Sequence, residues 1–320
     1  LVDNGMTLDE WFDIWMDTCK KNCRNSSRRV YKTAYNRLSE SLGWRKLSTL
    51  NLLTLQKTFN DLPSDASRKY SKAILVDMLN KAQESDLIVK NVALKVNTVI
   101  DNTQKEEKRI LTQDEIDLLL KESYNSYLYP ILVVALNTGM RIGEIIGLTW
   151  DCIDFENNFI SVRKTLCYLP ELMENHYEFH LPKTKAGNRD IPMGIKVKEV
   201  LEQQKKVQEE KGKSFPPKEG FEKLVFTGRR NNPINTPNIS ESFERLVRKI
   251  NKKNQGIILY SITPHTLRHT FASNCIAKGM RPKTLQKILG HSSLKMTMDL
   301  YCHVSDDTIK QEMSAVIEMV

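Results

Sequence analysis

The stretch "ITPHTLRHTFASNCIAKG", residues 262–279, holds the pattern that decides the fold of this chain. It has the features of one amphipathic helix. Thr263 is a favourable N-cap, Pro264 suits the first helical position, and Gly279 stands where a left-handed C-terminal cap is expected. Apolar residues recur at four-residue spacing, which indicates a buried stripe: Leu267, Phe271 and Cys275.

Three basic side chains, His265, Arg268 and His269, stand within this helix. His265 and Arg268 are three residues apart and share a face near the helix N-terminus, where free backbone N–H groups and the helix dipole favour an anion. A phosphate is therefore the expected ligand. A solvated or structurally satisfied His–Arg pair remains an alternative at this point.

The composition of the whole chain favours a nucleic-acid partner. Its 320 residues exceed what one core usually holds, which predicts two domains. A net charge of +9 attracts polyanions such as DNA through released counterions. No apolar run is long enough to span a membrane, no signal pattern opens the chain, and six cysteines are scattered, so we expect a soluble, cytoplasmic protein. The first residue is Leu rather than Met, which leaves room for a longer natural chain.

Two histidine pairs have a spacing that suits a metal site. His176 and His180, and likewise His265 and His269, show H-x-x-x-H spacing, which places two imidazoles on one face of a helix. Neither pair has the glutamate of H-E-x-x-H, and no cysteine pair or acidic cluster offers further ligands. We therefore expect no metal and no cofactor.

Residues 1–105 are expected to form an all-helical domain. Thr7 and Glu10 make a capping box at the start of a helix. Further segments favour helix: 28–42, 50–62, 64–85 and 91–100. Six basic residues of this domain are candidate contacts for a DNA backbone: Arg28, Arg29, Lys32, Arg68, Lys69 and Lys72. Solvated helix faces carry the same pattern, so both interpretations stay open.

Residues 101–109, "DNTQKEEKR", lack apolar side chains, which is typical of a linker between domains. A second capping box, Thr112 and Glu115, follows at once, and the candidates for chemistry all lie beyond it, in residues 106–320. Between Trp150 and Met193 the pattern changes to short alternating runs with turn residues between them. The expected fold class is therefore mainly α with a small antiparallel β-sheet.

Residues 128–150, "LYPILVVALNTGMRIGEIIGLTW", predict an apolar helix that ends near Gly139 and a new turn or helix that begins near Arg141. A guanidinium among apolar neighbours is unfavourable unless it is paired. Glu144, three residues on, can orient Arg141 from the same helical face. A purely structural Arg–Glu pair remains the alternative.

Lys185 lies at the shoulder of a Gly-containing turn in "YEFHLPKTKAGNRDIPM", residues 177–193, which predicts a hairpin. A lysine in that place can reach outwards to a ligand, although hairpin lysines commonly only aid solubility. Lys183 lies two residues earlier on the same strand, and a shift of register would exchange the two lysines.

Two more candidates follow the helix of residues 262–279. The segment 281–293, "RPKTLQKILGHSS", predicts a helix that Gly290 ends, so that His291 stands just past the C-cap. One more short helix, within residues 293–304, carries Tyr301, which a core aromatic would also explain.

Taken together, these motifs resemble the tyrosine recombinase, or phage-integrase, family. The resemblance rests on "TGMRIGE" with Arg141, "KTKAGNRDIP" with Lys185, "HTLRH" with His265 and Arg268, "LGHSS" with His291, and "MDLY" with Tyr301. All six family positions are filled in order, and they cover most of the second domain. The sequence looks most like integrases of bacterial conjugative transposons, and the helical first domain is similar to the family's core-binding domain in organisation.

The resemblance implies an enzyme, a site-specific DNA recombinase that integrates or excises a mobile element without metal or ATP. Tyr301 is then the nucleophile that forms a 3′-phosphotyrosyl bond and releases a 5′-hydroxyl, and Lys185 protonates that leaving oxygen. Bond energy is retained, because one phosphodiester is exchanged for another.

The resemblance also implies how the phosphate is held. Arg141 and Arg268 clamp it, since a planar guanidinium binds two phosphate oxygens and stays charged in the transition state. His265 and His291 supply further hydrogen bonds, and His265 also helps proton transfer from the tyrosine. Two residues support the site from behind: Glu144 and His269.

The implied partner is double-stranded DNA, at the element's ends and at the target site, and the implied location is the bacterial nucleoid. The tail 305–320 includes the apolar, helix-compatible segment "IKQEMSAVIEMV". Family tails of this kind often pack on a neighbouring subunit, which implies a homotetramer assembled on DNA. An accessory DNA-bending or excision factor is a further implied partner. The alternatives are a type IB topoisomerase, which relaxes circles without strand exchange, and an architectural DNA-binding protein that does not cut.

Overall fold

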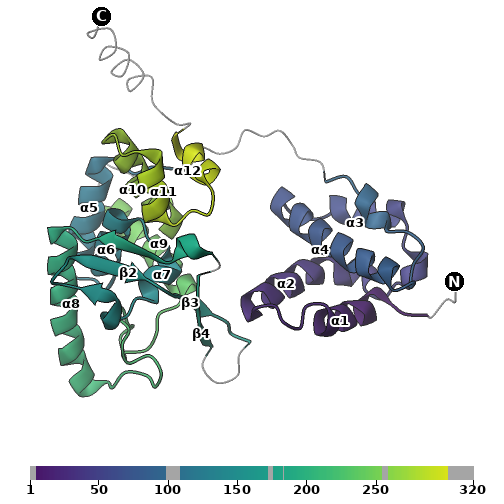
Figure 1. Ribbon diagram of the computed structural model, residues 1–320, viewed down its shortest axis with the longest axis horizontal. Helices are drawn as coiled ribbons and strands as arrows, with labels where there is room; N and C mark the ends of the chain where they lie inside the picture. Colours follow the sequence, from purple (N-terminus) through teal and green to yellow (C-terminus); the bar gives the residue numbers. More distant parts are fainter. Residues whose placement is uncertain (1–4, 99–108, 172–175, 183, 254–258, 302–320) are drawn as a thin grey trace, which may run out of the picture. The chain divides into compact units, whose positions relative to one another are not determined.

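The computed structural model describes residues 5–98, 109–171, 176–182, 184–253 and 259–301 (Figure 1). The chain divides into two compact units, Leu1–Glu106 and Glu107–Val320. Of the expected linker, 101–109, all but Arg109 lies outside the described residues. The predicted fold class is confirmed: the chain is mainly helical, with small antiparallel sheets in the second unit.

The first unit is built from helices whose starts are fixed by local caps. Its elements are α1 (Leu8–Thr18), α2 (Asn25–Leu42), α3 (Leu52–Asn60) and α4 (Asp65–Glu84), with the 3-10 turns η1 (Leu47–Thr49) and η2 (Val92–Lys95). The predicted capping box is present at α1, where the Thr7 side chain and Glu10 satisfy each other's backbone N–H groups. Ser64 is the N-cap of α4, and its side chain accepts a hydrogen bond from the backbone N–H of Ser67.

The helix expected over 91–100 is wrong for the described part of that range. Only η2 forms there, because the Asn91 side chain accepts from the N–H of Ala93 and Val96 turns to extended backbone. Both Ala93 and Val96 are fully buried, so the segment packs as an irregular cover on the helices. Tertiary packing outweighs the local helix preference here.

An aromatic core holds the first unit together. Trp15 is fully buried, and Phe12 of α1 stacks on Tyr35 of α2 with ring centroids 3.8 Å apart. Leu38 of α2 and Leu75 of α4 close the core from the other helices. An aromatic pair of this kind contributes about 1 kcal/mol beyond its buried area.

The second unit surrounds one apolar helix. Its helices are α5 (Gln113–Ser123), α6 (Leu128–Thr138), α7 (Ile142–Ile146), α8 (Ile195–Ser214), α9 (Thr236–Lys253), α10 (Pro264–Ala277), α11 (Pro282–Leu289) and α12 (Leu294–Tyr301), with 3-10 turns η3 (Trp150–Cys152) and η4 (Lys185–Gly187). In α6 the consecutive residues Ile131 to Val134 are all fully buried. A helix that is apolar on every side is covered on every side, and α10, α8 and α5 pack against it.

The second unit contains two small antiparallel sheets, whereas the sequence predicts one. Strands β1 (Ile153–Asp154), β2 (Phe159–Val162) and β5 (Arg189–Pro192) form one sheet in the order β1-β2-β5, and β3 (Thr165–Tyr168) pairs with β4 (Tyr177–His180) in the other. The hairpin expected within 177–193 is therefore wrong, because β4 and β5 belong to different sheets. Pro182, which has no backbone N–H, and the turn η4 lie between them.

The ends of several helices of the second unit meet in one place. Gly139 ends α6 and Gly290 ends α11, both with positive φ (61° and 64°). Arg141 lies two residues after Gly139, and His291 directly follows Gly290. Among the described residues, no helix is long and apolar enough to cross a membrane.

Candidate active site

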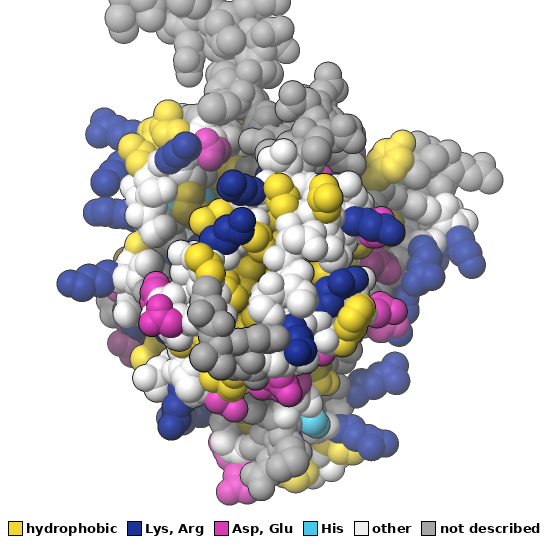
Figure 2. Space-filling model, turned by 90° about the vertical axis from the view of Figure 1, so that its right-hand side faces the viewer, with side chains coloured by type: hydrophobic (Ala, Val, Ile, Leu, Met, Phe, Trp, Pro, Cys, Tyr) yellow, Lys and Arg dark blue, Asp and Glu magenta, His cyan; other side chains and the backbone are white. Residues whose placement is uncertain are grey.

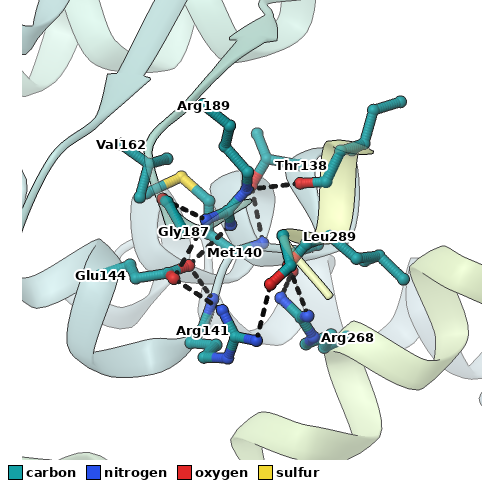
Figure 3. A network of polar contacts seen from close by, with 12 residues as sticks. Thr138, Met140, Arg141, Glu144, Val162, Gly187, Arg189, Arg268 and Leu289 are labelled. Carbon is teal, nitrogen blue, oxygen red and sulfur yellow. Dashed lines mark hydrogen bonds and ion pairs between the residues drawn. The ribbon is translucent and has the colours of Figure 1, made fainter. Parts of the chain in front are cut away.

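Arg268 lies in α10 and joins the ends of two other helices (Figure 3). Its Nη1 donates to the carbonyl of Gly139 at 2.6 Å and its Nη2 to the carbonyl of Leu289 at 2.7 Å. One guanidinium thereby fixes the C-terminal ends of α6 and α11. Burial, followed by the charge of Arg141, lowers the pKa of Arg268 to about 9, so the side chain is still protonated at pH 7.

Arg141 is the N-cap of α7, and Glu144 orients it as expected. The Arg141 Nη1 lies 2.9 Å from Glu144 Oε1, and the backbone N–H of Arg141 donates to Glu144 Oε2 at 2.8 Å. Its Nη2 donates to the carbonyl of Gly290 at 3.3 Å. The Arg141 side chain is 40% exposed, so it can reach a ligand while it stays anchored.

Arg189 is a member of this cluster that the sequence analysis did not single out. It lies at the start of β5, and its Nη1 and Nη2 donate to the two carboxylate oxygens of Glu144 at 3.1 and 2.7 Å (Figure 3). The signal was present in "NRDIPM", where alternation places Arg189 on the same strand face as the buried Ile191. A charged residue on the buried face of a strand requires a partner.

Glu144 is buried between its two arginines and stays ionised. Burial works to raise the pKa of its carboxyl group, but hydrogen bonds from Arg189 and the charges of Arg189 and Arg141 together hold it below its usual value. The carboxylate thus neutralises part of the positive charge of the cluster and fixes two guanidinium groups at once.

His291 follows Gly290 directly and is buried. Its Nδ1 lies 2.9 Å from the hydroxyl of Thr297, in α12. Burial, then the charges of Arg268, Arg141 and Arg189, lower the pKa of His291 to about 4. The imidazole is therefore neutral at pH 7 and acts through hydrogen bonds rather than charge.

A small pocket of about 130 Å³ lies beside Arg268 and His291. The lining comes from α10, the end of α11 and α12: Arg268, His269, Ala272, Leu289, His291, Met296 and Leu300. The expected supporting residue His269 is thus placed at the same cluster. Tyr301 is the last residue of α12, and its side chain lies outside what the structure describes.

His265 differs from Arg268 in burial, although the two were expected to share one face. His265 is exposed near the start of α10, whereas Arg268 is buried. The His265 ring lies 6.4 Å from that of His269, between centroids. Within the described ranges, the interaction of His265 is this ring contact and not a hydrogen bond to an arginine.

Lys185 begins the turn η4 and is exposed. It lies in a connection between the two sheets and not at a hairpin shoulder, which corrects the predicted setting but leaves the residue free to reach outwards. The turn packs closely on the end of α11. The space between them is so small that a Cβ atom on Gly290 would lie 2.9 Å from the carbonyl oxygen of Ala186. Lys183 lies outside the described residues, so the choice between the two lysines stays a prediction.

The six basic candidates of the first unit separate into two groups. Arg28 donates to the carbonyls of Met16 and Lys20, Arg68 to those of Phe59 and Leu62, and Lys72 to that of Val96. These three serve the fold of their own domain. The other three are exposed: Arg29, Lys32 and Lys69. On the face in Figure 2, Lys and Arg side chains are spread among apolar and acidic ones, so charge alone does not outline a contact surface.

The histidine pair at 176 and 180 does not have helical geometry. His180 ends β4 and His176 immediately precedes that strand. In the part of the chain that the structure describes, no group of three or more His, Cys, Asp or Glu residues is placed to hold a metal ion.

Family matches cover large parts of both units of the chain. Residues 103–308 match the phage integrase family, and residues 7–62 match the phage integrase N-terminal SAM-like domain. The chain belongs to the phage integrase family. The predicted resemblance is therefore confirmed.

A transposon transposase and a tyrosine recombinase are among the similar proteins. The transposase of transposon Tn916 from Enterococcus faecalis is 34% identical over 212 residues, which are 66% of this chain and 49% of that protein. A XerC-like tyrosine recombinase from Caldanaerobacter subterraneus is 29% identical over 298 residues, 88% of this chain and 73% of its own length. The chain thus spans about half the length of the Tn916 transposase.

Solved integrase structures share the fold along nearly the whole chain. The Tn1549 transposon integrase in complex with transposon right end DNA has a TM-score of 0.82 and 27% identity, and the match covers 98% of this chain and 100% of that one. A lambda integrase dimer bound to a core site has a TM-score of 0.70 with 20% identity, over 92% of this chain and 77% of that one, and shows the fold alone.

Proposed function

We propose that this chain cuts and rejoins DNA as a site-specific recombinase that integrates or excises a mobile element. The observation that carries the proposal is the crowding of positive charge around Arg268. Burial, together with the charge of Arg141, lowers the pKa of Arg268 to about 9, and burial, together with the charges of the three arginines, lowers that of His291 to about 4. A bound anion relieves repulsion of this kind, and we assign that anion as a DNA phosphate.

The proposed reaction exchanges one phosphodiester for another. The Tyr301 oxygen attacks the phosphorus, a 3′-phosphotyrosyl bond forms, and the bond to the 5′ oxygen breaks. Lys185 gives the leaving oxygen a proton, while His265 helps to remove the proton of the tyrosine. A second 5′-hydroxyl then reverses the sequence, so no nucleotide cofactor or metal is consumed.

The arginines and His291 hold the phosphate during this exchange. Arg141 and Arg268 face the charge that develops on the nonbridging oxygens, where fixed cations lower the barrier. His291 is neutral at pH 7 and adds a hydrogen bond. Glu144 keeps the Arg141 guanidinium in place, and His269, the next residue of α10, supports the site beside Arg268.

The proposed partners are double-stranded DNA and further copies of the chain. The solved Tn1549 integrase structures contain transposon right end DNA or circular intermediate DNA, which supports DNA as the partner here. Residues 305–320, outside the described range, are proposed to pack on a neighbouring subunit of a homotetramer formed on DNA. An accessory DNA-bending or excision factor and action in the bacterial nucleoid belong to the same proposal.

Covalent capture tests the function. The parent chain and Tyr301→Phe are incubated with nicked duplexes from the ends of the encoding element, and the products are separated on denaturing gels. The nick lets the short 5′-hydroxyl fragment diffuse away, so a phosphotyrosyl adduct accumulates. An adduct with the parent alone is the expected result.

The controls separate binding from chemistry. Gel shifts first establish that both proteins bind the duplex. If a bound duplex gives no adduct with the parent, the chain is an architectural DNA-binding protein and the proposal is wrong. Deletion of residues 305–320 is expected to weaken multi-subunit complexes in the same gel shifts, and unchanged complexes would refute the role of the tail.

A further inference from the structure

Three consecutive carbonyls at the end of α11 accept hydrogen bonds from three different arginines. The Ile288 carbonyl accepts from Arg189 Nε at 2.6 Å, that of Leu289 from Arg268 Nη2 at 2.7 Å, and that of Gly290 from Arg141 Nη2 at 3.3 Å. The last carbonyls of a helix lack partners within the helix, so these arginines satisfy them. The direction in which the chain leaves α11 toward His291 is set by this contact.

Arg189 differs from Arg141 in how its guanidinium is used. Its Nε, Nη1 and Nη2 all donate to protein acceptors, since Nη1 also reaches the carbonyl of Gly187 at 3.3 Å. The Arg189 side chain is 5% exposed, against 40% for Arg141. Arg268 lines the pocket beside His291 whereas Arg189 does not, so we assign Arg189 to the groups that it holds and not to a phosphate.

Each acceptor of Arg189 supports a different residue of the proposed site. Glu144 holds the Arg141 side chain. Gly187 ends the turn η4, which Lys185 begins. Ile288 lies three residues before His291, in the last turn of α11.

Arg189 packs tightly against Gly290 at the end of α11. A Cβ atom on Gly290 would lie 2.9 Å from Arg189 Nη1 and 3.1 Å from its Cδ, and Gly290 has φ of +64°. Side chain and helix end thus lie in direct contact, and a shift of Arg189 moves both η4 and the end of α11.

We propose that Arg189 is a positioning residue that sets Arg141, Lys185 and His291 relative to one another for DNA cleavage. This inference rests on the proposed function. Lysine is not an adequate replacement, because a single ammonium cannot span a carboxylate and two carbonyls as the planar guanidinium does. Loss of the Arg189 guanidinium leaves buried acceptors without partners, so that Arg141, Lys185 and His291 all become less firmly positioned.

Single-turnover cleavage of the nicked duplex tests the proposal with Arg189→Lys. Cleavage is expected to slow by about 30-fold or more, because small misplacements of reacting groups have large effects on rate. Affinity for the duplex is expected to stay within about twofold, because Arg189 presents no exposed charge. Parent-like cleavage by Arg189→Lys overturns the proposal.

Arg163→Lys is the matched control. Arg163 also donates to carbonyls, those of Val162 and Arg189, and pairs with Asp190 at 2.6 Å, but its side chain is 43% exposed. Its cleavage rate is expected to stay within about twofold of the parent, since exposed ion pairs contribute little.

A sulfur leaving group separates positioning from a general loss of stability. A duplex with a 5′-bridging phosphorothiolate releases a thiolate, which needs no proton from Lys185. We compare the cleavage rate of the phosphorothiolate duplex with that of the ordinary duplex. If Arg189 positions Lys185, the ratio of the first rate to the second rises in Arg189→Lys, as it does in Lys185→Ala. The ratio compares two substrates of one variant, so the fraction of folded protein cancels.

Glu144→Gln is a second variant for the case that Arg189→Lys folds poorly. It keeps the shape of the Glu144 side chain but weakens its interaction with Arg189. Its ratio is also expected to rise. An unchanged ratio in both variants, or in Lys185→Ala itself, overturns the part of the proposal that concerns Lys185. Absence of any adduct with the parent would instead show that the proposed function has failed.

Discussion

His291 Nδ1 lies 2.9 Å from Thr297 Oγ1, and this contact joins the residue after α11 to α12. Thr297 is fully buried, so no water competes for its hydroxyl. The short helix that ends at Tyr301 is therefore tied to the arginine cluster through one polar contact between side chains.

Replacement of Thr297 by Val tests the strength of that tie. Valine has nearly the same shape but leaves the imidazole nitrogen of His291 unpaired, so the free energy of unfolding is expected to fall by about 1–3 kcal/mol. Urea denaturation followed by circular dichroism measures the change. Thr297→Ser, which keeps the hydroxyl, is the control, and equal losses in both variants would show that the methyl group and not the hydrogen bond matters.

The pKa of His291 predicts how stability depends on pH. It is about 4 in the folded protein, below the ordinary value of 6.5, so the unfolded chain takes up the proton first as the pH falls. The free energy of unfolding therefore decreases from about pH 6.5 down to about pH 4 and is insensitive to this group below that range. By pH 5 the loss is roughly 2 kcal/mol relative to neutral pH.

His291→Gln isolates this group from the other titrating residues. Urea unfolding of the parent and the variant is compared at about pH 5 and at neutral pH. The parent is expected to lose more stability on acidification than the variant. An equal loss in both proteins means that His291 does not carry the effect.

Features that depend on neighbours in sequence were predictable. The capping boxes of Thr7 and Thr112 lie within single turns, and Arg141 meets Glu144 three residues away, so spacing alone places each pair. Gly290 as the end of α11 follows from the same local reasoning. Family resemblance added the order of the candidate residues, and the structure brings Arg141, Arg268 and His291 together.

Features that depend on distant partners were not predictable in the same way. Arg189 contacts Glu144 across 45 residues and Ile288 across 99, and no local pattern links them. The pairing of β5 with β2 instead of β4 is also set by what packs around the strands, since alternation shows a face but not a partner. The Tyr301 side chain is not described, so its role stays a prediction.

Gly290 is expected to tolerate alanine less well than Gly279. Both have positive φ, +64° and +74°, so alanine is strained at either position by about 1–2 kcal/mol. A Cβ atom on Gly279 meets nothing within 4 Å, whereas one on Gly290 would lie 2.9 Å from the Ala186 carbonyl oxygen. Gly290→Ala should therefore lower the melting temperature further.

The same pair of variants reports on the site. Gly279→Ala measures backbone strain alone, and the additional loss in Gly290→Ala measures the contact with Ala186 and Arg189. Adduct formation is expected to slow only in Gly290→Ala. Equal melting temperatures for the two variants would mean that the junction at Gly290 yields without cost.

Two adjacent basic residues of α4 are expected to behave differently. Arg68 donates to the carbonyls of Phe59 and Leu62, 3.3 and 3.0 Å away, and so fixes the end of α3, whereas Lys69 is exposed. Arg68→Ala should lower the free energy of unfolding by about 1–3 kcal/mol, because its partners lose their donor. Lys69→Ala should change stability by less than about 0.5 kcal/mol.

The two variants are expected to affect DNA binding in the opposite order: Lys69→Ala more than Arg68→Ala. If Lys69 contacts a phosphate, Lys69→Ala weakens binding and reduces the slope of log K against log salt concentration by about 1, because one fewer counterion is released. Arg68→Ala keeps the parent slope, since its guanidinium is already engaged within the domain. Fluorescence anisotropy over a series of salt concentrations gives both slopes. A parent slope for Lys69→Ala would remove that residue from the DNA-contacting group, and a reduced slope for Arg68→Ala would show that its internal hydrogen bonds open on DNA.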